Sequence, residues 1–153
     1  MKRTWKPLVL AAAVLAVALV ALLARPSTSE AVDAVVTVYK SPYCGCCTKW
    51  VDHMQENGFT VEVKEMVDVS PVRQRHGIDT HLASCHTSTV AGYALEGHVP
   101  ADVVKKLLKE KPQVAGLAVP GMPQSAPGMD IGNDPYDVLA FRPDGGTYVF
   151  ARE

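Results

Sequence analysis

Three of the four cysteines in this 153-residue chain stand at positions 44, 46 and 47, where a predicted strand meets a predicted helix. Residues 35–39 are β-branched and apolar, which predicts a buried strand. The apolar positions that follow are spaced i, i+3, i+4 and i+7, as on one face of a helix: Cys47, Trp50, Val51 and Met54. The chain therefore has to place clustered sulfur at a turn from strand to helix.

Such a turn favours reactive sulfur. The first turn of a helix leaves backbone N–H groups free and carries the positive end of the helix dipole, so it favours thiolate over thiol. Cys44 and Cys47 form a C-x-x-C motif at the first strand-to-helix turn of an alternating chain. This combination predicts a single α/β domain with a thioredoxin-like fold.

The remaining segments complete a predicted order of β-α-β-α-β-α-β-β. Strands are expected over residues 59–66 and 87–95, and a short helix is expected from Ser70, as N-cap, to residue 76. A longer helix is expected to begin at Pro100 and to end before Pro112. Two segments, residues 79–86 and the Gly- and Pro-rich residues 116–135, are predicted to be loops. Residues 137–142 and 147–152 predict a C-terminal β-hairpin.

Residues 1–31 predict an export signal ahead of a domain over residues 32–153. Basic side chains precede an unbroken apolar run over residues 8–24, and Ser29 and Ala31 permit cleavage after Ala31. The run is longer than most signal cores (roughly 7–15 residues) and at the lower limit of a bilayer span (roughly 17–25), so an uncleaved membrane anchor is the alternative. Both interpretations place the domain outside the cytoplasm, in the periplasm or an equivalent compartment.

The charge balance argues against a nucleic-acid partner. The whole chain carries a net charge of −1, and residues 1–31 contain four of the Lys and Arg residues and one Glu. Residues 32–153 therefore carry a net charge of −4 and no basic block. Binding to nucleic acid is not expected from such a domain.

Cys85 is expected to face the cysteines of the turn. It stands immediately before the third predicted strand, and in thioredoxin-like folds the segment that enters this strand passes beside the C-x-x-C turn. Four sulfurs would then share one pocket. Thiolates are soft ligands that select Cu(I), and crowded thiolates can bridge several Cu(I) ions. The sequence therefore predicts copper ligation by Cys44, Cys46, Cys47 and Cys85.

Three other interpretations compete with copper. Two structural disulfides are disfavoured because Cys46 and Cys47 are adjacent. A dithiol oxidoreductase would use Cys44 and Cys47 as its catalytic pair, with Cys46 as an interfering thiol. A structural zinc site usually pairs two separated C-x₂₋₄-C units, and this chain has one.

Imidazole and thioether groups extend the candidate ligand set. His86 is the favoured imidazole because Cys85 fixes its surroundings, and Met122 and Met129 are candidate thioether ligands in the Gly- and Pro-rich loop. The other histidines are expected to stay out of the ligand set: His53 as a partly exposed helix residue, His76 and His98 as cap or surface residues, and His81 as a surface residue or an outer hydrogen-bonding partner of the site.

Five motifs together resemble the CopG-type copper-resistance proteins, a family first known as a domain of unknown function. They are Tyr-Cys-Gly-Cys-Cys at 43–47, Ser-Cys-His-Thr at 84–87, Gly-Tyr at 92–93 with Glu-Gly-His-Val-Pro at 96–100, Gly-Leu-Ala-Val-Pro-Gly-Met-Pro at 116–123, and Pro-Gly-Met at 127–129. The resemblance extends over nearly all of residues 34–152.

The resemblance implies an exported thioredoxin-like domain that binds copper through Cys44, Cys46, Cys47 and Cys85, and thiolate chemistry predicts one or more Cu(I) ions there. It also implies interconversion of Cu(I) and Cu(II) during periplasmic detoxification, which makes other periplasmic copper-handling proteins the expected partners. Where thioredoxins have a cis-proline before the third strand, this chain has Cys85-His86-Thr87. That difference argues against a peptide-disulfide substrate and for a metal.

Overall fold

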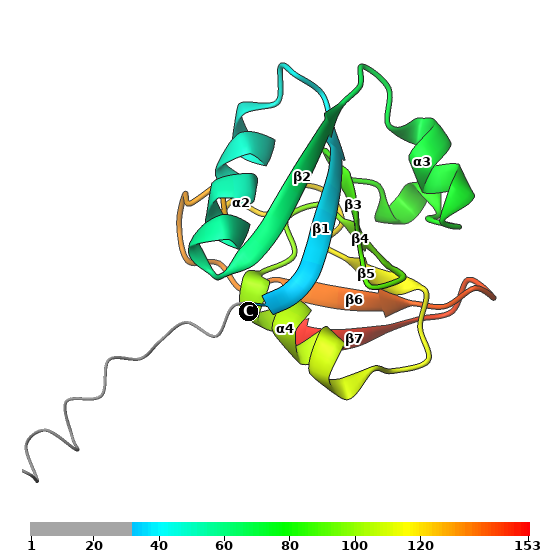
Figure 1. Ribbon diagram of the computed structural model, residues 1–153. Coiled ribbons are helices and arrows are strands. Elements are labelled where there is room, and N and C mark those ends of the chain that lie inside the picture. Colours follow the sequence, from blue (N-terminus) through cyan, green and yellow to red (C-terminus); the bar gives the residue numbers. More distant parts are fainter. Residues whose placement is uncertain (1–31) are drawn as a thin grey trace, which may run out of the picture.

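A seven-stranded sheet in the order β2-β1-β3-β4-β5-β6-β7 runs through the computed structural model, which describes residues 32–153 (Figure 1). The β1–β2 and β4–β5 pairs are parallel, and the other neighbours are antiparallel. The strands are β1 Val32–Lys40, β2 Phe59–Glu65, β3 Thr87–Val90, β4 Tyr93–Glu96, β5 Gly116–Ala118, β6 Asp137–Phe141 and β7 Thr147–Arg152.

Three helices cover the two faces of the sheet (Figure 1). Helices α2 (Gly45–Glu56) and α4 (Ala101–Glu110) pack on one face, where Trp50 and Leu107 share a core with Val36 of β1. Helix α3 (Ser70–Arg75) and the 3-10 turn Thr80–Leu82 lead across the other face, where Leu82 packs in a smaller cluster. The central strands β3, β4 and β5 are thus mostly buried, whereas the edge strands β2 and β7 are largely exposed.

Local sequence signals explain the ends of the two long helices. Cys44 is the N-cap of α2, and the helix ends at Asn57, where Gly58 adopts a positive φ of 90°. Helix α4 begins after Pro100, whose fixed φ suits a helix start, and ends at the left-handed Lys111.

The prediction of a single mixed α/β domain with a C-terminal hairpin is confirmed, because β6 and β7 pair directly through the turn after Phe141. Within residues 32–153, no helix combines the length and the apolar character needed to cross a bilayer. The predicted signal or anchor over residues 1–31 lies outside the described residues.

Four details of the predicted elements are wrong. The expected third strand, residues 87–95, is two strands, since Ala91 and Gly92 both have positive φ and form a two-residue hairpin turn between β3 and β4. Residues 116–118 form β5, because pairing with β4 and β6 overrides the local Gly and Pro content. Helix α3 has Val69 rather than Ser70 at its N-cap, while residues 80–82 of the expected loop form a 3-10 turn.

The topology brings four chain segments to one edge of the sheet. The end of β1 lies beside the start of β3, with Tyr39 paired to Thr87, and Thr87 is in turn paired to Glu96 at the end of β4. Glu96 is paired to Ala118, the last residue of β5. The segments that carry the predicted site residues all leave or enter the sheet at this edge.

Candidate metal centre

The first turn of α2 carries three of the four sulfurs. Cys44 Sγ accepts a hydrogen bond from Cys47 N at 3.3 Å and lies 3.5 Å from Cys46 Sγ. Cys44 and Cys47 form a disulfide, whereas Cys46 and Cys85 are free thiols. The structure therefore describes the oxidised C-x-x-C pair, and its reduction would release two further thiols.

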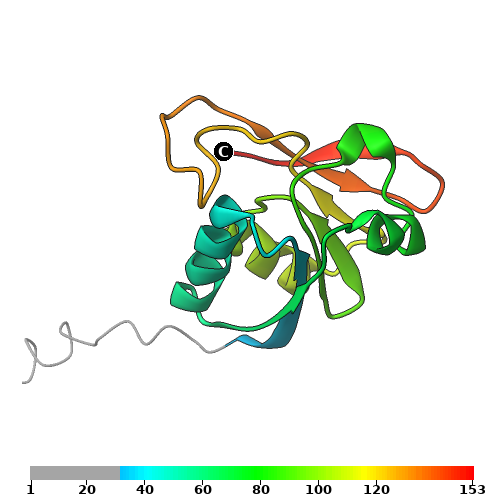
Figure 2. The same ribbon diagram turned by 90° about the horizontal axis from the view of Figure 1, so that it is seen from above.

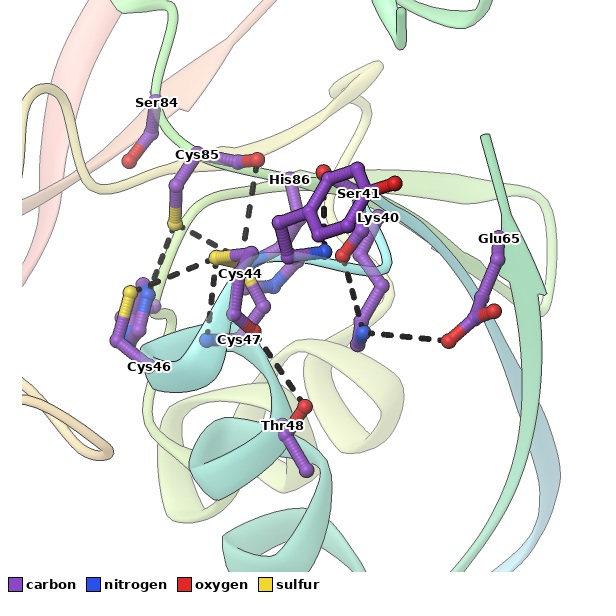
Figure 3. Close-up of a disulfide and its surroundings, with 12 residues drawn as sticks. Lys40, Ser41, Cys44, Cys46, Cys47, Thr48, Glu65, Ser84, Cys85 and His86 are labelled. Atoms are coloured by element: carbon purple, nitrogen blue, oxygen red, sulfur yellow. Dashed lines mark hydrogen bonds and ion pairs between the residues drawn. A yellow bond between two sulfur atoms is a disulfide. The ribbon is translucent and has the colours of Figure 1, made fainter. Parts of the chain in front are cut away.

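Cys85 faces this turn from the segment that enters β3 (Figure 3). Its carbonyl oxygen lies 3.9 Å from Cys47 Sγ, and the four Sγ atoms all lie within 4.8 Å of one another. The prediction that Cys85 meets the three cysteines of the turn therefore agrees with the geometry. Four sulfurs at this spacing can share a soft metal ion or bridge several.

Two buried histidines extend the sulfur cluster into the core. His86 Nδ1 lies 3.4 Å and His98 Nε2 2.9 Å from Cys85 Sγ. The ligand atoms of Cys47, Cys85, His86 and His98 lie within 4.8 Å of one another and form a second donor group that shares two sulfurs with the first. The site is thus a mixed sulfur and nitrogen donor set.

His98 is oriented for ligation. Its Nδ1 lies 2.6 Å from the carbonyl oxygen of Pro127, which only accepts hydrogen bonds, so Nδ1 carries the proton. The lone pair of Nε2 then points at Cys85 Sγ. Metal-bound histidines commonly donate their second ring N–H to a backbone carbonyl in this way, which fixes the tautomer and the ring orientation.

His86 has a ring nitrogen with no partner. The side chain is fully buried, its ring centroid lies 4.5 Å from that of Trp50, and Nε2 is one of two buried polar side-chain atoms in residues 32–153 that lack a hydrogen bond. A buried unsatisfied polar atom costs about 1–3 kcal/mol. The local packing therefore holds an imidazole where an apolar ring would cost less.

Burial sets the protonation of these groups. Burial and, to a smaller extent, the nearby Cys46 raise the pKa of the Cys85 thiol to about 12. Burial also lowers the pKa of His86 well below 6.5, with nearby basic side chains adding to the effect, and lowers the pKa of His98, which the Pro127 carbonyl partly opposes. At neutral pH the metal-free site therefore holds neutral imidazoles and a protonated thiol, and a bound metal would displace the thiol proton.

The expectation that His98 is a cap or surface residue is wrong. Its side chain is 1% exposed and contacts Cys85 directly. Gly97, with φ of +73°, turns the chain after β4, and a Cβ there would lie 2.5 Å from Ser84 Oγ. The turn at Gly97 brings the Ser84–Cys85 segment against the connection between β4 and α4. The only sequence signal for this role is the placement of His98 between a strand end and a helix start.

The other candidates lie outside the two donor groups. Met122 is 54% exposed and Met129 is half-buried, both in the loop of residues 119–136, and their role as ligands stays a prediction. His53 stays out of the cluster, as expected, and its Nε2 accepts a hydrogen bond from Ala101 N at 3.1 Å, which caps α4. His81 forms an exposed pair with Asp79, and His76 caps the end of α3.

Comparisons with known proteins identify the family of this chain. Residues 82–129, which include Cys85, His86 and His98, match the family described as "Protein of unknown function, DUF411". No curated protein matches the chain. Two solved structures, titled "Copper resistance protein copG" in Form 2 and Form 1, are 38% and 39% identical to it, with TM-scores of 0.74 and 0.73. Each covers 78% of this chain, and the alignments cover 98% and 96% of the respective relatives. The chain belongs to the CopG family of copper resistance proteins.

Proposed function

We propose that this chain binds Cu(I) in the periplasm through Cys44, Cys46, Cys47 and Cys85 as part of copper resistance. The observation that carries the proposal is the convergence of four sulfurs from two segments within 4.8 Å. Thiolates select Cu(I) over harder ions, and the two similar solved structures bear the name of copper resistance proteins. The predicted export signal is the basis for the periplasmic location.

His98 and His86 complete the proposed ligand set on its buried side. His86 Nδ1, 3.4 Å from Cys85 Sγ, and the Nε2 lone pair of His98 are the available nitrogen donors, and both imidazoles are neutral. Imidazole suits Cu(II) as well as Cu(I), whereas thiolate favours Cu(I). A mixed set can therefore hold copper in both valences. Met122 and Met129 remain candidate thioether ligands from the covering loop.

The disulfide supports a redox role toward copper. In the reduced protein, the Cys44 and Cys47 thiols can close to a disulfide, releasing two electrons and two protons. Two Cu(II) ions each accept one of these electrons and become Cu(I). Copper is the substrate of this step, and an external reductant must reopen the disulfide for a second cycle.

A thiol-disulfide oxidoreductase is the second candidate, because Cys44 and Cys47 form a disulfide at the start of a helix. Cys46 argues against it, since its sulfur lies 3.5 Å from Cys44 Sγ and would capture a mixed disulfide formed there. Reduction of insulin disulfides separates the two functions. Efficient turnover that survives Cys46→Ser and Cys85→Ser would favour the oxidoreductase.

The test of copper binding is anaerobic titration of the reduced domain with Cu(I) against a competing chelator. Wild type is expected to bind at least one Cu(I), and Cys85→Ser is expected to lower the stoichiometry or to weaken binding at least about tenfold, because a ligand is lost. His81→Gln is the matched control, since His81 pairs with Asp79 on the surface. Binding unchanged by Cys85→Ser would contradict a site shared between the two segments.

A further inference from the structure

Glu96, the last residue of β4, is a fully buried carboxylate that no ligand role explains. Its Oε1 accepts hydrogen bonds from Arg73 Nε and from Ser84 N, both at 2.7 Å. Its Oε2 accepts from Thr87 Oγ1 at 2.6 Å. Three donors from three segments thus converge on one side chain.

These contacts hold the residues on both sides of Cys85. Ser84 donates its N–H to Glu96, its carbonyl oxygen accepts from Arg73 Nη2, and its hydroxyl donates to the carbonyl of Gly121. On the other side, the His86 carbonyl accepts from Gly97 N at 2.9 Å. Cys85 itself makes no backbone pairing within this group of contacts. The hydrogen bonds of Ser84 and His86 therefore set the position of Cys85.

The close approach of two turns makes the arrangement rigid. A Cβ on Gly97 would lie 2.5 Å from Ser84 Oγ and 2.8 Å from the Val119 carbonyl, so the Ser84 segment rests directly on the backbone after β4. Arg73 comes from α3 on the opposite face of the sheet from α2, and its side chain is 18% exposed. The pair therefore ties the Cys85 segment to α3 and β4.

We propose that the Arg73–Glu96 pair positions Cys85 against the first turn of α2 and so sets the copper affinity of the site. The inference rests on the proposed copper function. A buried ion pair contributes little net stability relative to well-packed apolar side chains, because desolvation of both charges offsets their attraction. What this pair supplies is geometry, since the main-chain N–H and C=O of Ser84 both need partners with fixed directions.

Glu96→Gln and Arg73→Lys test the proposal by two routes. The first keeps the shape of Glu96 but weakens its hydrogen bonds, and the second keeps the charge of Arg73 but cannot bridge Glu96 and the Ser84 carbonyl with one fork. Each is expected to lower Cu(I) affinity about 10–100-fold, as is typical when a partner that orients a ligand is lost. Arg73 is partly exposed, so Arg73→Lys is expected to fold. It therefore tests the proposal even if Glu96→Gln does not fold.

The Cys85→Ser background separates positioning from general destabilisation. If the pair acts through Cys85, Glu96→Gln has no further effect on Cu(I) affinity in Cys85→Ser protein. Equal losses in both backgrounds would overturn the proposal. Leu107→Ala, a core change in α4, and Asp137→Asn, which breaks the exposed pair with Arg152, are the controls, and both are expected to keep wild-type affinity.

Hydrogen exchange of the metal-free protein gives a readout without copper. The amide of Ser84 is expected to exchange at least about tenfold faster in Glu96→Gln, while amides of β6 and β7 keep their wild-type rates. An unchanged exchange rate at Ser84 would overturn the positioning of this segment by Glu96. Wild type that binds no copper would instead overturn the proposed function, whereas wild-type binding with unchanged affinity in Glu96→Gln would overturn the positioning role alone.

Discussion

At the scale of single residues, the buried side of the site consists of groups that burial holds in their uncharged forms. His86 and His98 flank Cys85 Sγ, and both have a lowered pKa because they are desolvated. A neutral imidazole can donate a lone pair to a metal, whereas a protonated one cannot. The core thus keeps these nitrogens ready to ligate even below their ordinary titration range.

The lowered pKa of His86 predicts a loss of stability on acidification. Below about pH 6.5, the ordinary value, the unfolded chain takes up a proton on this residue that the folded chain does not. Stability is therefore full above pH 6.5 and falls as the pH drops. Replacement by Phe, as His86→Phe, is expected to reduce the slope between pH 6.5 and 5.5 by about 1 kcal/mol per pH unit, because the unfolded imidazole is only partly protonated in this range.

The measurement is urea unfolding of the metal-free protein at several pH values. Leu107→Ala serves as the control, because it lowers stability by about 2–5 kcal/mol without removing a titrating group and should leave the slope unchanged. A slope in His86→Phe equal to that of wild type would show that His86 does not stay neutral in the fold.

At the scale of elements, the loop of residues 119–136 covers the first turn of α2 (Figure 2). A Cβ on Gly128 would lie 2.8 Å from both the Cys46 carbonyl and Trp50 N, so the loop backbone touches the helix that carries the sulfurs. The preceding residue, Pro127, supplies the carbonyl that orients His98. The loop that packs against α2 therefore also sets the orientation of the His98 ring.

Gly128→Ala is expected to destabilise the protein by about 2–4 kcal/mol, from a strained positive φ of +85° and from the clash with α2. Gly132→Ala is the matched control, because Gly132 has φ of +99° but a Cβ there would meet no atom within 4 Å, and only the strain of about 1 kcal/mol remains. Urea unfolding measures both. Equal losses in the two variants would mean that the loop does not press on α2.

At the scale of the whole molecule, the strand order explains why distant residues meet. Antiparallel pairing of β1 with β3 and of β3 with β4 returns the chain twice to the edge where α2 begins. Cys85 and His98 arrive at that edge from opposite ends of this β3–β4 hairpin. A metal bound there would link segments about forty and fifty residues apart, counted from the cysteines of the turn.

Copper is therefore expected to stabilise the reduced fold. In the unfolded chain Cys44, Cys46 and Cys47 stay close together, whereas Cys85 and His98 are far from them. The increase in stability on copper binding therefore measures the contribution of Cys85 and His98. With free Cu(I) at 100 times the dissociation constant, the free energy of unfolding should rise by up to about 2.7 kcal/mol. Cys85→Ser should lose most of this gain and Leu107→Ala should keep it, as measured by anaerobic denaturation. A gain fully retained in Cys85→Ser would locate the binding in the turn alone.

The local sequence determined the strand, the C-x-C-C turn and the helix that begins at the cysteines, because periodicity and turn chemistry act over a few residues. It also determined the C-terminal hairpin, the end of α2 through Asn57-Gly58 and the start of α4 through Pro100. The placement of Cys85 opposite the turn depended on an expected fold, and the geometry agrees with it.

Only the tertiary structure decided the existence of β5, the burial of His98 and the convergence on Glu96. Each depends on which segments pair across the sheet, and no short-range pattern encodes that choice. Residues 116–118 form a strand only because β4 and β6 lie on either side. His98 has the sequence surroundings of a cap residue, and it becomes a candidate ligand because Gly97 and Pro127 enclose it against Cys85.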